Sequence, residues 1–194
     1  MSSTNRSNVR DFHKFDYYVT PQKPIEQFLN RFLENHPNID REKISVLDPC
    51  CGGDVVNEPS YVAVLERMGF KNIHSIDLRG DSKAQVKADF LRDDIDIKPS
   101  IIISNPPFCL AQDFIERSLD IVTDGGCVIF LLRLNFLGSK ERYQFFQKHM
   151  PVEIYVHHRR MGFIPNSSQT DSIEYAHFVW GKGFNPDSSK LYLV

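Results

Sequence analysis

The sequence lacks the features of a membrane or secreted protein. It has no hydrophobic run long enough to span a bilayer, and the segment from Met1 to Asn8 is polar, without an apolar leader. We therefore expect a soluble, cytoplasmic protein. Cysteine is also scarce, and no pair has the C-x-x-C spacing of a zinc or redox site. We expect no metal site. We expect four reduced cysteines that serve in packing, and the adjacent Cys50 and Cys51 would lie near a pocket; the other two are Cys109 and Cys127.

Neither sign of charge is in large excess, because the formal net charge is only −2. This argues against a strongly basic surface that coats nucleic acid. The charges are uneven, however, with six basic residues against two acidic ones between Arg133 and Arg160. Such a segment is typical of a local phosphate-binding face, and also of a solvated helix and strand. The residues that would contact nucleic acid are Arg133, Lys140, Arg142, Arg159 and Arg160.

Apolar runs of strand length alternate with amphipathic helical patterns along the 194 residues. The pattern predicts an α/β fold with a mostly parallel seven-stranded sheet, helices on both faces and an antiparallel hairpin of the last two strands at one edge. We expect a flexible N-terminal arm over residues 1–15 and one domain over 16–194. Expected strands are 44–47, 72–76, 85–88, 101–104, 127–132, 152–156 and 173–180. A first helix is expected to begin at Pro21 or Pro24 and to end near 35–37, and further helices are expected over 60–68, 111–122 and 140–149.

The most informative motif is Asn105-Pro106-Pro107-Phe108, directly after the apolar run 101–104. It would lie at the carboxyl end of a buried strand, where α/β sheets bind ligands. The prolines fix the direction of the Pro106 carbonyl, Asn105 adds a side-chain acceptor, and Phe108 adds a flat apolar face. These groups suit a planar ligand with an exocyclic amino group, such as adenine or cytosine. The alternative is a Pro-Pro turn that only ends a strand.

Three successive expected strands end in aspartate, at Asp48, Asp77 and Asp89. Asp77 is in the usual place for a carboxylate that accepts both ribose hydroxyls, and Asp89-Phe90 could bind the adenine amino group and ring. Gly52-Gly53 would let the backbone approach a ligand closely. No G-x-G-x-x-G is present, and Asp48 would repel a pyrophosphate but attract a cation. Adenosine with a cationic tail, as in S-adenosylmethionine, satisfies this set, although Asp48 alone could also be a turn cap.

From Tyr17 to Trp180 the chain resembles the amino-group DNA methyltransferases of the class I S-adenosylmethionine-dependent fold, which carry a D/N/S-P-P-Y/F/W motif. It looks most like the small phage- and prophage-encoded adenine methyltransferases. The matching segments are Tyr18-Val19-Thr20-Pro21, Val46 to Gly53, Asp77, Asp89-Phe90 and Asn105 to Phe108.

This resemblance implies a single-domain, Rossmann-like adenine-specific (N6) DNA methyltransferase that uses S-adenosylmethionine. It implies a catalytic motif at Asn105, Pro106, Pro107 and Phe108. It implies cofactor contacts at Tyr18, Thr20, Pro21, Asp48, Pro49, Cys50, Gly52, Gly53, Asp77, Leu78, Asp89, Phe90 and Asn105.

The chain departs from the family in two ways. The family loop usually ends Gly-x-Gly, whereas Asp54 stands in place of its second glycine. The chain also has no room for a separate target-recognition domain, so target choice would come from the basic segment, from the loop 159–171, from a partner subunit, or be loose.

Several alternatives share the motif. Related enzymes methylate amino groups of adenine or guanine in RNA, and others methylate a glutamine of release factors. The glutamine enzymes usually carry an extra N-terminal helical domain, for which the stretch before Ile44 is too short. A non-catalytic, cofactor-binding subunit of a heterodimer is a further alternative, because Asp54 alters the cofactor loop.

Overall fold

A computed structural model describes residues 18–163 and 170–194. Its centre is a sheet of eight strands in the order β3-β2-β1-β4-β5-β7-β6-β8. Only β7 runs antiparallel to its neighbours. The strands are β1 (Ser45–Asp48), β2 (Asn72–Asp77), β3 (Val86–Lys87), β4 (Ile101–Ser104), β5 (Cys127–Arg133), β6 (Glu153–Val156), β7 (Tyr175–Gly181) and β8 (Lys190–Leu193).

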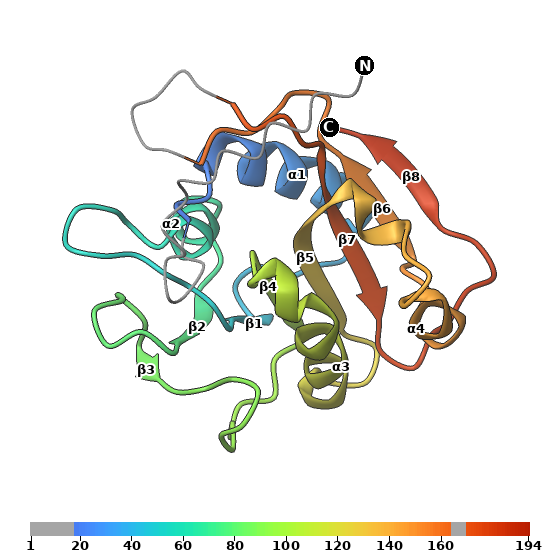
Figure 1. The fold of residues 1–194 in the computed structure, drawn as a ribbon. Coiled ribbons are helices and arrows are strands. Elements are labelled where there is room, and N and C mark those ends of the chain that lie inside the picture. Colours follow the sequence, from blue (N-terminus) through green and yellow to red (C-terminus); the bar gives the residue numbers. More distant parts are fainter. Residues whose placement is uncertain (1–17, 164–169) are drawn as a thin grey trace.

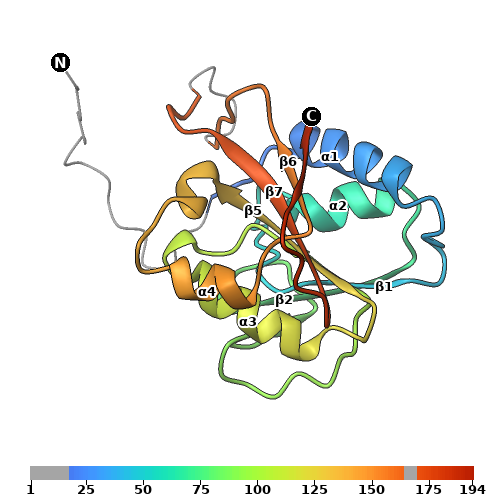
Figure 2. The ribbon, with the colours of Figure 1, turned by 90° about the vertical axis from the view of Figure 1, so that its right-hand side faces the viewer.

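Helices cover both faces of this sheet (Figures 1 and 2). The helices α1 (Gln22–Asn35) and α2 (Ser60–Arg67) pack on one face, and α3 (Ala111–Ile121) and α4 (Tyr143–Lys148) on the other. Two short 3-10 turns, η1 (Phe108–Leu110) and η2 (Leu134–Leu137), directly follow the motif prolines and β5. The described elements thus form the layered α/β fold that the sequence predicts.

The alternation of side chains along β4 builds the two halves of the core. Ile101 and Ile103 join the cluster under α1 and α2, whereas Ile102 joins the cluster under α3. All three are nearly fully buried. A strand buried on both faces is apolar throughout, which explains the unbroken run of isoleucines before the motif. Because β2, β1, β4 and β5 are parallel, their carboxyl ends meet at one edge of the sheet.

The mostly parallel sheet is confirmed, but the prediction of seven strands omitted one, because the structure has eight. β8 pairs in parallel with β6, so the β6–β7 hairpin lies inside β8 and not at the edge. The reason is that Leu191 and Leu193 are exposed, so this segment shows no buried apolar face in the sequence. Its anchor is Tyr192, whose ring stacks on Tyr155 with centroids 4.8 Å apart.

The expected arm over residues 1–15 lies outside the described residues. Within the described part of the chain, no helix has both the length and the apolar character needed to cross a membrane. The helix expected over 140–149 is shorter than predicted, because η2 and a turn precede it.

Candidate active site

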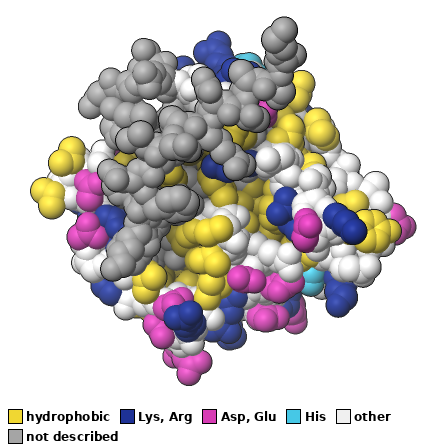
Figure 3. Space-filling model, in the orientation of Figure 1, with side chains coloured by type: hydrophobic (Ala, Val, Ile, Leu, Met, Phe, Trp, Pro, Cys, Tyr) yellow, Lys and Arg dark blue, Asp and Glu magenta, His cyan; other side chains and the backbone are white. Residues whose placement is uncertain are grey.

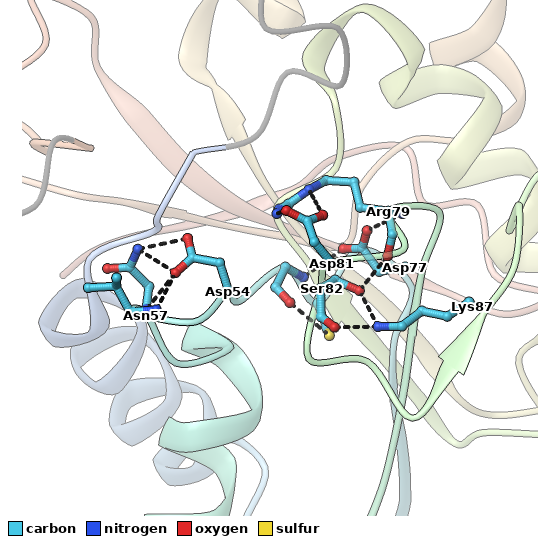
Figure 4. Close-up of polar contacts among 10 residues, drawn as sticks. Asp54, Asn57, Asp77, Arg79, Asp81, Ser82 and Lys87 are labelled. Carbon is cyan, nitrogen blue, oxygen red and sulfur yellow. Dashed lines mark hydrogen bonds and ion pairs between the residues drawn. The ribbon is translucent and has the colours of Figure 1, made fainter.

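The loop after β1 is tied to the end of β2 by the carboxylate of Asp77. Its Oδ2 accepts the backbone N–H of Gly52 at 2.7 Å, and its Oδ1 accepts that of Arg79 at 2.8 Å. The N–H of Lys83 in turn donates to the Gly52 carbonyl at 3.0 Å. Figure 4 shows this side of the loop, where Arg79 also pairs with Asp81. The predicted ribose-binding acid therefore also organises the loop beside it.

Both glycines of this loop have positive φ, 64° at Gly52 and 74° at Gly53. A Cβ on Gly53 would lie 3.1 Å from Pro59 and 3.2 Å from the Cβ of Lys83. Glycine is thus required twice over, by the left-handed backbone and by the close approach of neighbouring segments. The sequence prediction that Gly52 and Gly53 let the backbone approach a ligand closely stays a prediction.

The carboxylate of Asp48 is completely buried beneath this loop. Its Oδ1 accepts the Ser104 hydroxyl at 2.6 Å and the N–H of Cys50 at 3.1 Å. Its Oδ2 is buried without a hydrogen-bond partner among the described residues. Burial raises the pKa of Asp48 to about 7, although the bonds from Ser104 and Cys50 oppose the shift. A cationic group near Oδ2 would stabilise the ionised carboxylate.

Asp54, which stands where the family has glycine, makes a local turn. Its Oδ1 accepts the N–H groups of Val56 and Asn57 at 2.8 and 2.7 Å, and its own N–H donates to the Asn57 carbonyl at 2.9 Å. These bonds resemble an Asx turn, in which the side chain replaces backbone acceptors. Figure 4 shows Asp54 and Asn57 together on the side of the loop opposite Asp77. Asp54 therefore shapes the end of the loop that begins with Gly52 and Gly53.

The pair predicted to bind adenine lies in two different environments. Asp89 is half-buried and caps its own turn, accepting the N–H of Leu91 at 3.0 Å. Phe90 is only 2% exposed, and its ring stacks on Phe114 with centroids 5.4 Å apart. This leaves the Phe90 ring little surface for a ligand. Its position in the core was not foreseen, because an aromatic residue after a strand can turn either way.

The catalytic candidate Asn105 is held by a residue from the other end of the site. Its Nδ2 donates to the Thr20 hydroxyl at 3.0 Å. Its Oδ1 is buried and has no hydrogen-bond partner among the described residues. The structure thus brings the Tyr18–Pro21 segment and the motif together, although 85 residues separate them.

Phe108 begins η1 and is half-buried beside two residues of β5 and β7. The Arg133 guanidinium lies over its ring, with Cζ 4.7 Å from the centroid, and the ring of Tyr175 is 5.8 Å away. Phe163 contacts Tyr175 at 5.0 Å, and Tyr18 contacts Phe163 at 6.2 Å. Aromatic rings thus line the region between the motif and the N-terminal segment.

The remaining predicted cofactor residues lie around the same edge. Pro21 caps α1, Pro49 is buried in the loop, and Leu78 is 58% exposed directly after Asp77. The thiols beside the loop are protonated at neutral pH, because burial raises the pKa of Cys50 well above its usual value and that of Cys51 to about 12. This fits packing residues and not nucleophiles.

The predicted nucleic-acid contacts differ in exposure and in their partners. Lys140 and Arg159 are exposed, and Arg160 is exposed beside Glu174 at 3.6 Å. Arg142 is tied to η2, since its Nε donates to the Phe136 carbonyl at 2.7 Å. On the face shown in Figure 3, basic side chains are interspersed with acidic and hydrophobic ones.

Sequence reasoning missed two members of the site, Ser104 and Tyr175. Ser104 is the one polar residue at the end of the apolar β4, directly before the motif, so its position was a usable signal. Tyr175 reaches the site only because β7 inserts next to β5, an arrangement for which the sequence gives no local signal.

Comparisons with known proteins agree on the fold. A protein from Listeria monocytogenes assigned as a class I S-adenosylmethionine-dependent methyltransferase is similar at 16% identity, with a TM-score of 0.66, over 91% of this chain and 65% of that one. The M protein of the type I restriction enzyme EcoKI is similar at 13% identity, with a TM-score of 0.64, over 93% of this chain and 49% of that one. A Pyrococcus horikoshii protein assigned as an RNA methyltransferase is similar at 15% identity, with a TM-score of 0.64, over 88% and 89%.

No protein-family model and no curated protein matches the sequence. The chain spans about two thirds of the Listeria protein and about half of the EcoKI M protein. At these identities the likeness shows the fold alone. The chain therefore has the fold of the class I S-adenosylmethionine-dependent methyltransferases, as its sequence predicts.

Proposed function

We propose that this protein transfers the methyl group of S-adenosylmethionine to the exocyclic amino group, N6, of adenine in DNA. The observation that carries the proposal is the buried Oδ1 of Asn105, an acceptor without a partner in the described residues, in an Asn-Pro-Pro-Phe motif at the carboxyl edge of the sheet. A structural turn would have no reason to leave this acceptor unsatisfied, since a buried unpaired polar group costs ~1–3 kcal/mol.

The loop residues fit S-adenosylmethionine. Gly52 and Gly53 keep the backbone free of Cβ atoms, and the buried Asp48 favours a cationic ligand. Asp77, at the end of β2, would accept the ribose hydroxyls. Leu78, Asp89 and the Tyr18–Pro21 segment would complete the contacts. When bound, S-adenosylmethionine supplies a methyl group on a positively charged sulfur.

Asn105 and the Pro106 carbonyl would accept the two N–H bonds of the target amino group. These bonds orient the nitrogen lone pair and stabilise the positive charge that develops on nitrogen during transfer. Phe108 would stack on the base, which must leave its helix or already be single stranded. The transfer would be a direct displacement, in which the bond from N6 to the methyl carbon forms as the sulfur–carbon bond breaks and the amino group then releases a proton to solvent. Positioning would therefore supply much of the rate.

The experiment is transfer of labelled methyl from S-adenosylmethionine to unmethylated DNA and to RNA, side by side, followed by nucleoside analysis. The proposal predicts label in DNA as N6-methyladenine. Label in RNA alone would indicate that the substrate is RNA. The structural likeness to a protein assigned as an RNA methyltransferase is the reason for including RNA in the test. Cofactor binding without transfer to either would favour a non-catalytic subunit.

A partner subunit is part of the proposal. The EcoKI M protein, which resembles this chain over about half of its own length, is one component of a restriction enzyme. Adding a cell extract from the native host to an inactive preparation tests whether a partner supplies target recognition. Gain of transfer, lost again with Asn105→Ala, would place the catalytic residues in this chain.

A further inference from the structure

Arg133 and Phe108 are brought together by the pairing of β4 with β5. Phe108 follows β4 by three residues, and Arg133 is the last residue of β5. The guanidinium Cζ lies 4.7 Å from the centroid of the Phe108 ring. This is longer than the ~3.5–4.0 Å contact of two fully eclipsed flat groups, so the guanidinium is off-centre or tilted. Phe108 is only half-buried, so part of this residue remains exposed for a second flat group.

The position of Arg133 is fixed from the neighbouring strand. Arg133 pairs directly with Tyr175 of β7, and the Tyr175 ring is 2% exposed. The Tyr175 hydroxyl donates to Asp171 at 2.7 Å. Burial raises the pKa of Tyr175, so the hydroxyl stays protonated and remains a donor. The Arg133 side chain contacts the Tyr175 hydroxyl, where its charge opposes this rise in pKa. The phenol therefore supports the side chain that lies over Phe108.

The Nε of Arg133 is buried and has no acceptor among the described residues. A second guanidinium in the protein offers a direct contrast. Arg142 lies over the ring of Phe136 at 4.6 Å, almost the same separation, but its Nε donates to the Phe136 carbonyl at 2.7 Å. Stacking on phenylalanine therefore does not require an unsatisfied Nε. The donor of Arg133 points to a ligand.

We propose that Arg133 selects bases that carry an amino group beside an unprotonated ring nitrogen, by donating a hydrogen bond to that nitrogen. The inference rests on the proposed function, because the base is the group that would stack on Phe108. Asn105 offers an acceptor for the amino group, and Arg133 offers a donor for the adjacent ring nitrogen. Adenine presents this pair through its 6-amino group and N1, and cytosine presents it through its 4-amino group and N3, whereas thymine and uracil carry a carbonyl in place of the amino group.

The test uses an oligonucleotide that carries the adenine mapped in the transfer experiment, or 1-deazaadenine or 7-deazaadenine at that position. In the wild type, removing the nitrogen that Arg133 contacts should lower kcat/KM roughly tenfold, and removing the other should not. Arg133→Ala should lower kcat/KM on adenine by a similar factor and lose this discrimination. Arg133→Lys should restore part of the kcat/KM on adenine and part of the discrimination between the two deaza bases. Binding of S-adenosylhomocysteine should stay unchanged in both variants.

The matched control is Arg31→Ala, which removes a guanidinium 5.4 Å from the Tyr192 ring on the exposed side of α1. It should behave as the wild type does. Equal wild-type rates on all three bases would overturn the inference, and this result does not depend on the folding of any variant. Discrimination that persists in Arg133→Ala would also overturn it. Absence of any transfer by the wild type would overturn the proposed function and this inference together.

Discussion

Asn105 and Thr20 are joined by a hydrogen bond of 3.0 Å from Nδ2 to the hydroxyl. With Nδ2 engaged, Oδ1 is left as the free acceptor. The segment before α1 therefore orients the catalytic motif after β4. Thr20 acts as a positioning residue in addition to its proposed contact with the cofactor.

Thr20→Val removes the acceptor for Nδ2 while it keeps the shape of the side chain. We expect kcat to fall roughly tenfold, because the amide can rotate and present its N–H groups to the base. Thr20→Ser keeps the hydroxyl and should retain most of the activity. Steady-state transfer assays on both variants test this, and equal kcat values for the two would contradict it.

Gly53→Ala should damage the cofactor loop. Its φ of +74° and its contact with Pro59 leave no room for a Cβ, so we expect a loss of about 1–3 kcal/mol in unfolding free energy and weaker binding of S-adenosylmethionine. Gly80→Ala, which meets only open space, is the control. Chemical denaturation and calorimetric titration measure both effects. A loop that tolerates alanine at both positions would be inconsistent with the packing described.

Asp48 gives the protein a distinctive dependence of stability on pH. Its pKa is about 7 in the folded protein and 3.8 ordinarily, so the folded state binds a proton more tightly than the unfolded chain. This contribution to stability is full below about pH 4 and is lost as the pH rises through about 7, by roughly 2–4 kcal/mol. Asp48→Asn should lack this loss.

Urea unfolding at pH 5 and pH 8 measures the change. Between these values the wild type should lose more unfolding free energy than Asp48→Asn, since other titrating groups contribute equally to both. The exposed Asp124→Asn should follow the wild type. Identical pH dependence in wild type and Asp48→Asn would show that the buried carboxylate does not titrate in this range.

Arg159 and Arg160 are the exposed pair that we expect to contact phosphates. Changing both to glutamine should lower the magnitude of the slope of log Kobs against log salt concentration by up to about 2, because each contact releases about one counterion. The control is Lys71→Gln with Lys98→Gln, at the amino ends of β2 and β4, opposite the site. Binding measured by fluorescence anisotropy at several salt concentrations decides this, and an unaltered slope would remove these arginines from the interface.

The sequence predicted the features that local chemistry determines. The apolar run before Asn105 specified a strand buried on both faces, and the acids at positions 48 and 77 marked strand ends at one edge. The sequence did not predict contacts between segments that are distant along the chain. The Asn105–Thr20 bond depends on where α1 docks, and the approach of Arg133 to Phe108 depends on strand pairing. Phe90 was predicted to face a ligand, but its ring packs on Phe114, because a turn residue can point into the core or out of it.

The central claim is that the Asn105 oxygen receives the target amino group. Single-turnover transfer of labelled methyl to DNA, measured with binding of S-adenosylhomocysteine, tests it in wild type, Asn105→Ala and Asn105→Asp. We predict that Asn105→Ala lowers the transfer rate roughly a hundredfold or more with little change in binding, and that Asn105→Asp, which keeps an acceptor, retains more of the rate. Transfer by Asn105→Ala at the wild-type rate would contradict this assignment.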